Sequence, residues 1–154
     1  MTQPDITNWT GSRDRFLTIC QQNINRSIIT QNDFLHQLDP DVYDFATIQE
    51  PYLDSNHNSR ATHHWYMVYP KEHYITPAWM RSIILVNRRL ALESWAQVDV
   101  GSSDVTVLEF NMGKGRVLLT NVYNDIEQQQ GLARSICIFR KRLRMGESEG
   151  SMSR

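Results

Sequence analysis

Short runs of apolar residues along the chain predict a series of β-strands. The run Phe16–Asn23 mixes apolar and polar residues as strands do, and so does Val42–Glu50, where Pro51 removes the backbone donor that further pairing would need. Ser82–Asn87 is almost continuously apolar, which predicts a strand covered on both faces. Four further strands are predicted, of which the last three follow one another as a meander: Trp65–Pro70, Ala96–Val100, Val105–Phe110 and Arg116–Val122.

Two stretches of the chain show helical spacing. The first begins at Ser27, a residue type that caps helix N-termini, and runs to about Leu38, before Asp39 and Pro40 end it. The second is a basic amphipathic helix predicted over residues 132–145, whose apolar positions are Leu132, Ile136, Phe139 and Leu143.

The first helix lies between the first two strands, which is the order of a β-α-β unit with parallel strands. The carboxyl ends of these strands, at Asn23 and Glu50, would then lie on one edge of a sheet, where ligands of open α/β sheets bind. A carboxylate beside the amides of Asn23 and Asn25 suits Mg²⁺, which takes oxygen ligands and lets phosphate and water complete its shell. The alternative is that Glu50 is an ordinary solvated acid at the end of a strand, because a three-residue match to Gln-Glu-Pro is weak evidence by itself.

Composition indicates one globular domain, since 154 residues that are 40% hydrophobic can form a core. The polar residues 1–15 and 146–154 are expected to form a disordered leader and tail. No apolar run approaches the roughly 18 residues of a membrane span, and the N-terminus lacks the blocks of a signal peptide. We therefore expect an intracellular protein that is not secreted and has no membrane partner. Cys20 and Cys137 are expected to be buried thiols.

The net charge of −1 conceals an uneven distribution. Residues 1–110 carry 8 Lys and Arg against 13 Asp and Glu, whereas residues 111–154 carry 8 against 4. The positive C-terminal part could face phosphate, with Arg140, Lys141 and Arg142 as candidate contacts, or it could be a solvated helix face. The histidines show no metal-ligand spacing and are expected at the surface.

Three short motifs, Thr18–Asn25, Ile48–Glu50 and Thr120–Tyr123, occur in this order on predicted strands. Together they resemble the endonuclease/exonuclease/phosphatase superfamily, and most closely the apurinic-type endonuclease domain of LINE-type non-LTR retrotransposons, over about residues 16–131. The resemblance implies an α/β (α+β) fold that is part of a four-layer α/β sandwich. This chain would form mainly the first sheet with its flanking helices.

The resemblance also implies roles for individual residues. Glu50 would be the metal-binding glutamate, and Asn23 would help to fix that site. Asn25 would stand near the metal, and Tyr123 would touch the scissile phosphate. Arg26 stands where a glycine is common and is a candidate phosphate contact. The implied cofactor is Mg²⁺ or Mn²⁺, the implied partner is DNA, and a nuclear location is compatible with both.

Two motifs of that family are absent. Its water-activating pair comes from a Gly-Asp-x-Asn strand and a Ser-Asp-His motif, but the last aspartate here is Asp125 and the last histidine is His73. We therefore expect the N-terminal half of the domain, with little or no hydrolytic activity. Because Tyr123-Asn124-Asp125 replaces the usual Tyr-x-Pro-Asn, Asn124 and Asp125 are both candidates for the role of that asparagine.

A half domain would leave the face of a sheet uncovered, at strands such as Ser82–Asn87 and Arg116–Val122. Each Å² of apolar surface left in water forfeits roughly 25 cal/mol of stabilisation. We therefore expect low stability, or self-association through the uncovered face.

Three functional hypotheses remain open at this point, and whether the chain is an enzyme stays undecided among them. The first is a truncated, retroelement-derived, metal-dependent phosphodiesterase of the endonuclease type. The second is a non-catalytic nucleic-acid-binding module that uses the basic residues between Arg134 and Arg144, with affinity that falls steeply as salt rises. The third is a decayed fragment without a selected function.

Overall fold

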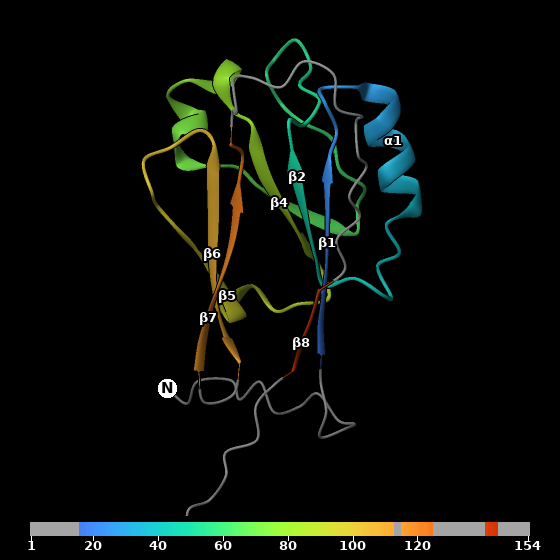
Figure 1. Ribbon diagram of the computed structural model, residues 1–154, viewed down its shortest axis with the longest axis vertical. Coiled ribbons are helices and arrows are strands. Elements are labelled where there is room, and N and C mark those ends of the chain that lie inside the picture. The colour runs from blue at the N-terminus through green and yellow to red at the C-terminus, as the bar shows by residue number, and fades with distance from the viewer. Residues whose placement is uncertain (1–15, 113–114, 125–140, 145–154) are drawn as a thin grey trace, which may run out of the picture.

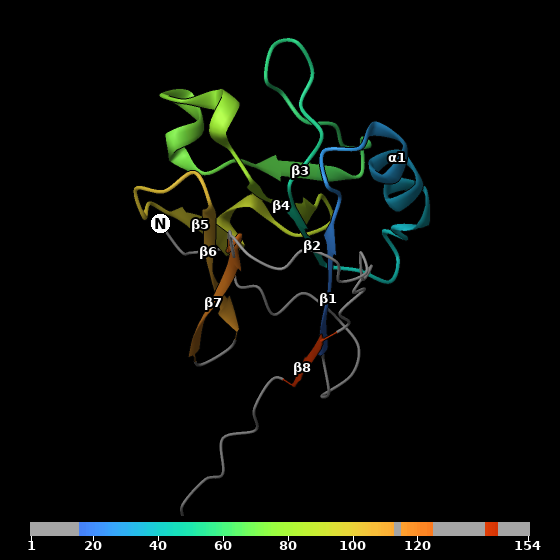
Figure 2. The same ribbon diagram turned by 45° about the horizontal axis from the view of Figure 1, so that its top comes forward.

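The structure, a computed structural model, describes residues 16–112, 115–124 and 141–144. These residues form two β-sheets that lie face to face, with the helix α1 (Ile28–Gln37) against the larger sheet (Figures 1 and 2). The larger sheet contains, in spatial order, β3 (Trp65–Val68), β4 (Ser82–Asn87), β2 (Phe45–Gln49), β1 (Phe16–Asn23) and β8 (Lys141–Arg144). The smaller sheet contains β5 (Trp95–Val98), β6 (Val105–Met112) and β7 (Gly115–Val122).

The predicted β-α-β unit is confirmed. β1 and β2 are parallel neighbours, with Asn23 opposite Gln49. Ser27 caps α1, because its side-chain oxygen accepts a hydrogen bond from the backbone nitrogen of Thr30 at 3.2 Å. The predicted meander is also confirmed, since β5, β6 and β7 pair antiparallel in sequence order. The segment between β3 and β4 contains two short 3₁₀ helices, η2 (Lys71–Tyr74) and η3 (Pro77–Trp79).

Apolar cores lie on both faces of the larger sheet. The core on the α1 side includes Phe34 and Leu35 from the helix and Ile48 from β2. In the core between the sheets, Phe45 of β2 stacks on Phe110 of β6, with ring centroids 5.1 Å apart. Within the described part of the chain, no helix is long and apolar enough to cross a membrane.

The expectation that Ser82–Asn87 would lie on an uncovered sheet face is wrong. All six residues of β4 are buried, because the smaller sheet, formed by this same chain, packs on the larger one. Part of β7 is exposed, including Leu118 at 61% and Val122 at 47%. Self-association through that surface stays a prediction. The histidine expectation is wrong for His73, which is buried and stacks on Tyr69 with ring centroids 4.2 Å apart.

The helix predicted over 132–145 is wrong at Lys141–Arg144. These residues form β8, which pairs antiparallel with β1 from Phe16 opposite Arg144 to Ile19 opposite Lys141. Helical spacing is a weak local preference, and the outer edge of β1 offers backbone partners that outweigh it. The rest of that predicted helix, the leader, the tail and Cys137 lie outside the described residues.

Asn121 of β7 links the two sheets through buried hydrogen bonds. Its side chain is 2% exposed, and Nδ2 donates to the backbone oxygens of Ile48 at 2.8 Å and Ile83 at 2.9 Å. In the other direction, the hydroxyl of Ser82 donates to the backbone oxygen of Asn121 at 2.9 Å. The end of β7 is therefore fixed to the ends of β2 and β4.

Replacing Asn121 with alanine should lower the free energy of unfolding by about 1–3 kcal/mol, because buried carbonyl oxygens of the larger sheet lose a donor. Urea denaturation followed by circular dichroism measures this change. The control is Asn124→Ala, an exposed position three residues further on, which should change stability by less than about 0.5 kcal/mol. Equal effects of the two substitutions would contradict the linking role of Asn121.

Candidate functional site

The ends of three strands meet at one edge of the larger sheet. Gln49, the last residue of β2, lies opposite Asn23 of β1 on one side and Ser82 of β4 on the other. The next residue, Glu50, donates its backbone N–H to the oxygen of Arg81 at 2.9 Å. Asn23 and Glu50 therefore lie on the same edge, as the parallel β-α-β unit predicts.

Tyr123, which follows β7 of the smaller sheet, reaches this edge. Its hydroxyl donates to Oε1 of Glu50 at 2.9 Å, and both side chains are half-buried. Two hydrogen bonds hold the segment around Tyr123 in place. The side-chain amide of Gln49 donates to the backbone oxygen of Val122 at 2.6 Å, and the backbone N–H of Tyr123 donates to the backbone oxygen of Asp104 at 2.8 Å. Packing of one sheet on the other thus joins two residues that the chain separates by 73 positions.

Arg81 and Asp104 support the tyrosine. The guanidinium of Arg81 donates to both carboxylate oxygens of Asp104, at 2.8 and 2.9 Å, and its central carbon lies 4.6 Å from the ring centroid of Tyr123. A bidentate pair of this kind fixes the guanidinium plane, and the plane in turn orients the phenol ring. The sequence prediction missed both residues. The only signal in the sequence was that Arg81 directly precedes the apolar run Ser82–Asn87. The antiparallel pairing of β4 with β2, which brings Arg81 to this edge, is seen only in the structure.

Asn23 and Asn25 lie at the same edge, but no hydrogen bond found between described residues joins either side chain to Glu50. Oδ1 of Asn23 instead accepts the backbone N–H of Asn25 at 2.8 Å, and both residues are exposed. Asn23 therefore fixes the turn that follows β1. Its proposed influence on a metal would act through that turn.

The turns at this edge contain three non-glycine residues with left-handed backbone: Asn25 (φ 52°), Arg26 (φ 56°) and Glu50 (φ 47°). Such a conformation costs roughly 1 kcal/mol or more for a residue with a Cβ, and it tends to occur at functional sites. The N–H of Arg26 donates to the oxygen of Glu50 at 2.8 Å, which connects the two turns. Glycine would adopt the conformation of Arg26 without strain.

The edge offers few ligands for a metal. Among the described residues, no group of three or more His, Cys, Asp and Glu side chains could hold an ion. Mg²⁺ is nevertheless often bound by one or two carboxylates, with phosphate oxygens and water completing the shell. The side chains present fit that kind of open site, with Glu50 as the carboxylate, and do not fit a closed protein cage.

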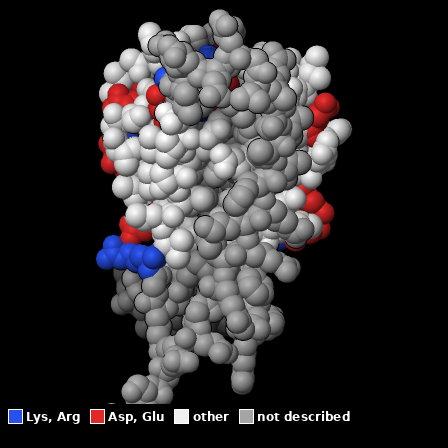
Figure 3. All heavy atoms as spheres, viewed as in Figure 1, with Lys and Arg blue, Asp and Glu red and all other residues white. Residues whose placement is uncertain are grey.

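The predicted basic contacts do not gather at this edge. Arg26 is exposed there, but Lys141 and Arg142 belong to β8, where Lys141 lies opposite Ile19 in the middle of β1. Arg140 lies outside the described residues. On the face shown in Figure 3, the described Lys and Arg side chains form no single patch, and Asp and Glu lie along both sides of it.

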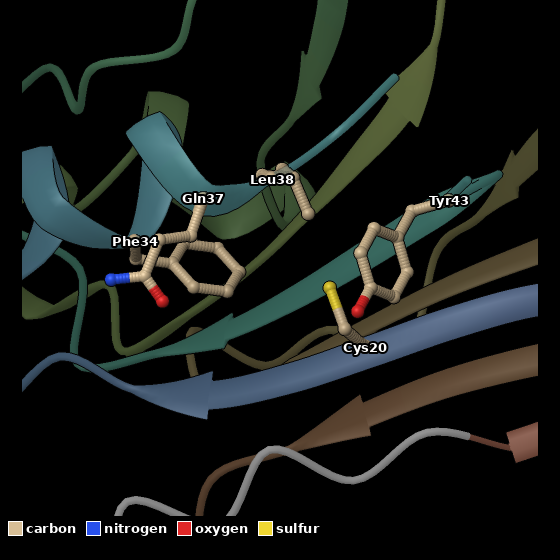
Figure 4. Close-up of a pocket in the computed structure, with 5 residues that line it drawn as sticks. All are labelled: Cys20, Phe34, Gln37, Leu38 and Tyr43. Carbon is tan, nitrogen blue, oxygen red and sulfur yellow. The ribbon is translucent and has the colours of Figure 1, made fainter. Parts of the chain in front are cut away.

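A separate small cavity of about 60 Å³ lies under α1, lined by Cys20, Phe34, Gln37, Leu38 and Tyr43 (Figure 4). Burial raises the pKa of the Cys20 thiol to about 12. The thiol therefore stays protonated at neutral pH and is a poor nucleophile. This confirms that Cys20 is a buried thiol and gives the cavity no evident chemistry.

We expect Cys20 to resist iodoacetamide at about pH 8 in the folded protein and to react once urea unfolds it. Peptide mass spectrometry locates the label, and rapid labelling of the folded chain at Cys20 would contradict the raised pKa.

The raised pKa of Cys20 also makes the free energy of unfolding depend on pH. The unfolded thiol ionises near 9.0 and the folded one near 12, so this group's contribution to stability is complete below pH 9 and is lost as pH rises towards 12.

No protein-family model matches the chain, and no curated protein sequence matches it. The fold does match the solved endonuclease domain of TRAS1, a telomere-specific non-LTR retrotransposon, with a TM-score of 0.52 over 75% of this chain. In fold, the chain resembles part of this endonuclease domain. The match covers 49% of the TRAS1 chain, so the present chain spans about half the length of that domain. Sequence identity to TRAS1 is 11%, so the likeness concerns the fold alone.

At the level of the fold, this match confirms the predicted resemblance to a non-LTR retrotransposon endonuclease domain. It also confirms the α+β class, with two sheets and one helix in the described residues. Those residues form three layers, helix, sheet and sheet, so the four-layer arrangement is confirmed in part.

Proposed function

We propose that this chain is an incomplete endonuclease-type domain, derived from a retroelement, which binds a divalent cation and a DNA phosphate beside Glu50. It would hydrolyse the phosphodiester weakly or not at all. The observation that carries the proposal is the hydrogen bond from Tyr123 to Glu50, which forms at a ligand-binding edge of the sheet and joins two motifs of the family. The fold of the TRAS1 endonuclease domain supports DNA as the class of substrate.

In this proposal, Glu50 holds Mg²⁺ or Mn²⁺, and the bound ion neutralises charge on the phosphate. Tyr123 keeps the carboxylate oriented, and its hydroxyl can turn to donate to a phosphate oxygen. Arg81, whose guanidinium carbon lies 4.6 Å from the ring centroid, limits movement of the phenol ring. Apart from the ion itself, phosphate binding therefore requires only groups that already lie at this edge.

Hydrolysis also needs a group that activates or orients water. Asp104 is a second carboxylate close to Tyr123, but both of its oxygens accept hydrogen bonds from Arg81. Residues 74–154 contain no histidine, and residues 126–154 contain no aspartate. The groups at the edge therefore suit binding better than catalysis.

The experiment is a plasmid-nicking assay with Mg²⁺ or Mn²⁺, together with calorimetric titration of Mn²⁺ into the protein. We expect the protein to bind Mn²⁺ and to nick DNA no faster than its Glu50→Ala variant. Strong nicking that disappears in Glu50→Ala would show that the domain is catalytically competent. Failure to bind Mn²⁺, or failure to bind DNA, would contradict the proposed function as a whole.

Arg26 provides an independent prediction. Replacing it with glycine should leave the free energy of unfolding unchanged or raise it by up to about 1 kcal/mol, because glycine adopts φ 56° without strain. The same change should weaken binding of a short DNA duplex at low salt, since a phosphate contact is lost. Urea denaturation and fluorescence anisotropy measure the two effects.

The control for Arg26 is Arg88→Gly, which removes the same charge just beyond the opposite end of β4. It should leave DNA affinity nearly unchanged. If both substitutions weaken binding equally, only net charge matters and Arg26 makes no specific contact.

A further inference from the structure

A second cavity, of about 430 Å³, opens beside the Glu50–Tyr123 edge. Arg81 lines this cavity and also stacks on Tyr123, so the two sites adjoin. The other residues that matter here are Trp79 of η3 and three hydroxyl residues, Thr76, Ser102 and Ser103.

Trp79 presents an aromatic surface to this cavity while being 72% exposed to solvent. Its neighbours Tyr74 and Ile75 are also highly exposed, so the segment carries a cluster of large side chains that the fold does not bury. Clustered exposed apolar side chains of this kind often mark a binding site, and an aromatic ring offers a flat face for stacking.

The charge of the cavity wall favours a neutral ligand. Arg81 is neutralised by its two hydrogen bonds to Asp104, and the nearby Lys71 lies 4.0 Å from Asp99. A phosphate would find no unpaired cation among the described residues that line this cavity. The hydroxyl groups of Thr76 and Ser103, 3.5 Å apart, can instead donate to or accept from the edge of a planar heterocycle.

We propose that this cavity binds an unpaired nucleobase, stacked on Trp79, from a strand whose phosphate lies at Glu50. The inference rests on the proposed function and extends it: the preferred ligand is DNA that is single-stranded or locally unpaired beside the bound phosphate. A phosphodiester held at the edge has a nucleoside on each side. The cavity that adjoins the edge through Arg81 provides a place for one of the two bases.

The test compares two single-stranded oligonucleotides of equal length, one of thymidines and one of abasic residues, titrated into the protein with Mg²⁺. Trp79 is far more exposed than Trp65, which is buried, so a stacked base should quench the protein's fluorescence. We expect quenching by the thymidine strand alone, and an affinity roughly tenfold or more above that of the abasic strand. Trp79→Ala should remove this preference, and Trp79→Phe should largely retain it in an anisotropy assay.

The matched control is Leu92→Ala, which removes another exposed apolar side chain, in the 3₁₀ helix Leu92–Ser94 beyond the opposite end of β4. It should leave the preference for bases unchanged. Equal affinity for the two strands, or a preference that survives Trp79→Ala, would overturn the inference. A third result would also overturn it: a wild-type protein that shows no preference for bases but self-associates, with the self-association lost in Trp79→Ala. That result would assign the exposed cluster of Tyr74, Ile75 and Trp79 to a protein contact.

The same titration in Glu50→Gln separates this inference from the proposed function. Base-dependent quenching should persist there, because stacking on Trp79 does not need the carboxylate. If the wild-type protein shows base-dependent quenching but binds no Mn²⁺, the nucleobase site stands and the metal proposal fails. If it binds Mn²⁺ without a base preference, the metal proposal stands and the nucleobase site fails.

Discussion

Replacing Glu50 with glutamine should weaken Mn²⁺ binding by roughly tenfold or more, because removing a unit charge in contact with a dication costs on the order of a few kcal/mol even in a partly solvated site. The substitution keeps the size of the side chain, and its amide oxygen can still accept the hydrogen bond from Tyr123. The fold should therefore survive, which circular dichroism checks. Isothermal titration calorimetry with Mn²⁺ measures the affinity.

The control for this change is Glu93→Gln. Glu93 is exposed and follows β4 at the end far from Ser82, so the substitution makes the same change in net charge without touching the site. It should leave Mn²⁺ affinity nearly unaltered. Parallel losses in both variants would mean that the ion responds to overall charge and has no specific ligand at Glu50.

Truncating Phe45 to alanine should lower the free energy of unfolding by about 3–5 kcal/mol, the usual cost of removing a buried aromatic ring. Phe45 lies in the larger sheet, is 1% exposed, and stacks on Phe110 of the smaller sheet. A loss of this size is a large share of the roughly 5–15 kcal/mol that stabilises a typical domain. Urea denaturation should show partial or complete unfolding of the variant.

Leu118→Ala is the comparison for Phe45, because Leu118 is a large apolar residue on an exposed part of β7. Its replacement should change stability by less than about 0.5 kcal/mol. If Phe45→Ala were equally mild, the two sheets would not share a core in solution. A Leu118→Ala variant that is much less stable would instead show that self-association covers this part of β7.

The sequence predicts the β-α-β unit well because each of its signals is local. Ser27 provides the cap of α1, and Pro51 follows the end of the second strand. For the same reason the continuous apolar run Ser82–Asn87 gives the bounds of β4. The strand at Lys141–Arg144 could not be predicted in this way. Its local spacing is helical, and its conformation depends on pairing with β1, more than a hundred residues earlier in the chain.

The same distinction holds for the candidate site: strand order predicts part of it, and the rest depends on how the two sheets pack. Asn23 and Glu50 could be placed at one edge from the strand order, since parallel strands end on the same side. The hydrogen bond between Glu50 and Tyr123, and the Arg81–Asp104 pair beneath the tyrosine, require the smaller sheet to pack on the larger one. The chain was expected to form mainly the first sheet, so these contacts between sheets could not be predicted.

The proposed function depends on a divalent ion that binds at Glu50, beside Tyr123. The most direct test is nuclear magnetic resonance of the ¹⁵N-labelled protein during titration with Mn²⁺, which broadens amide signals close to the bound ion. We expect the signals of Asn25, Glu50 and Tyr123 to broaden first while that of Leu92 stays sharp, and we expect this pattern to disappear in Glu50→Gln. Uniform broadening, or broadening centred elsewhere, would contradict this expectation.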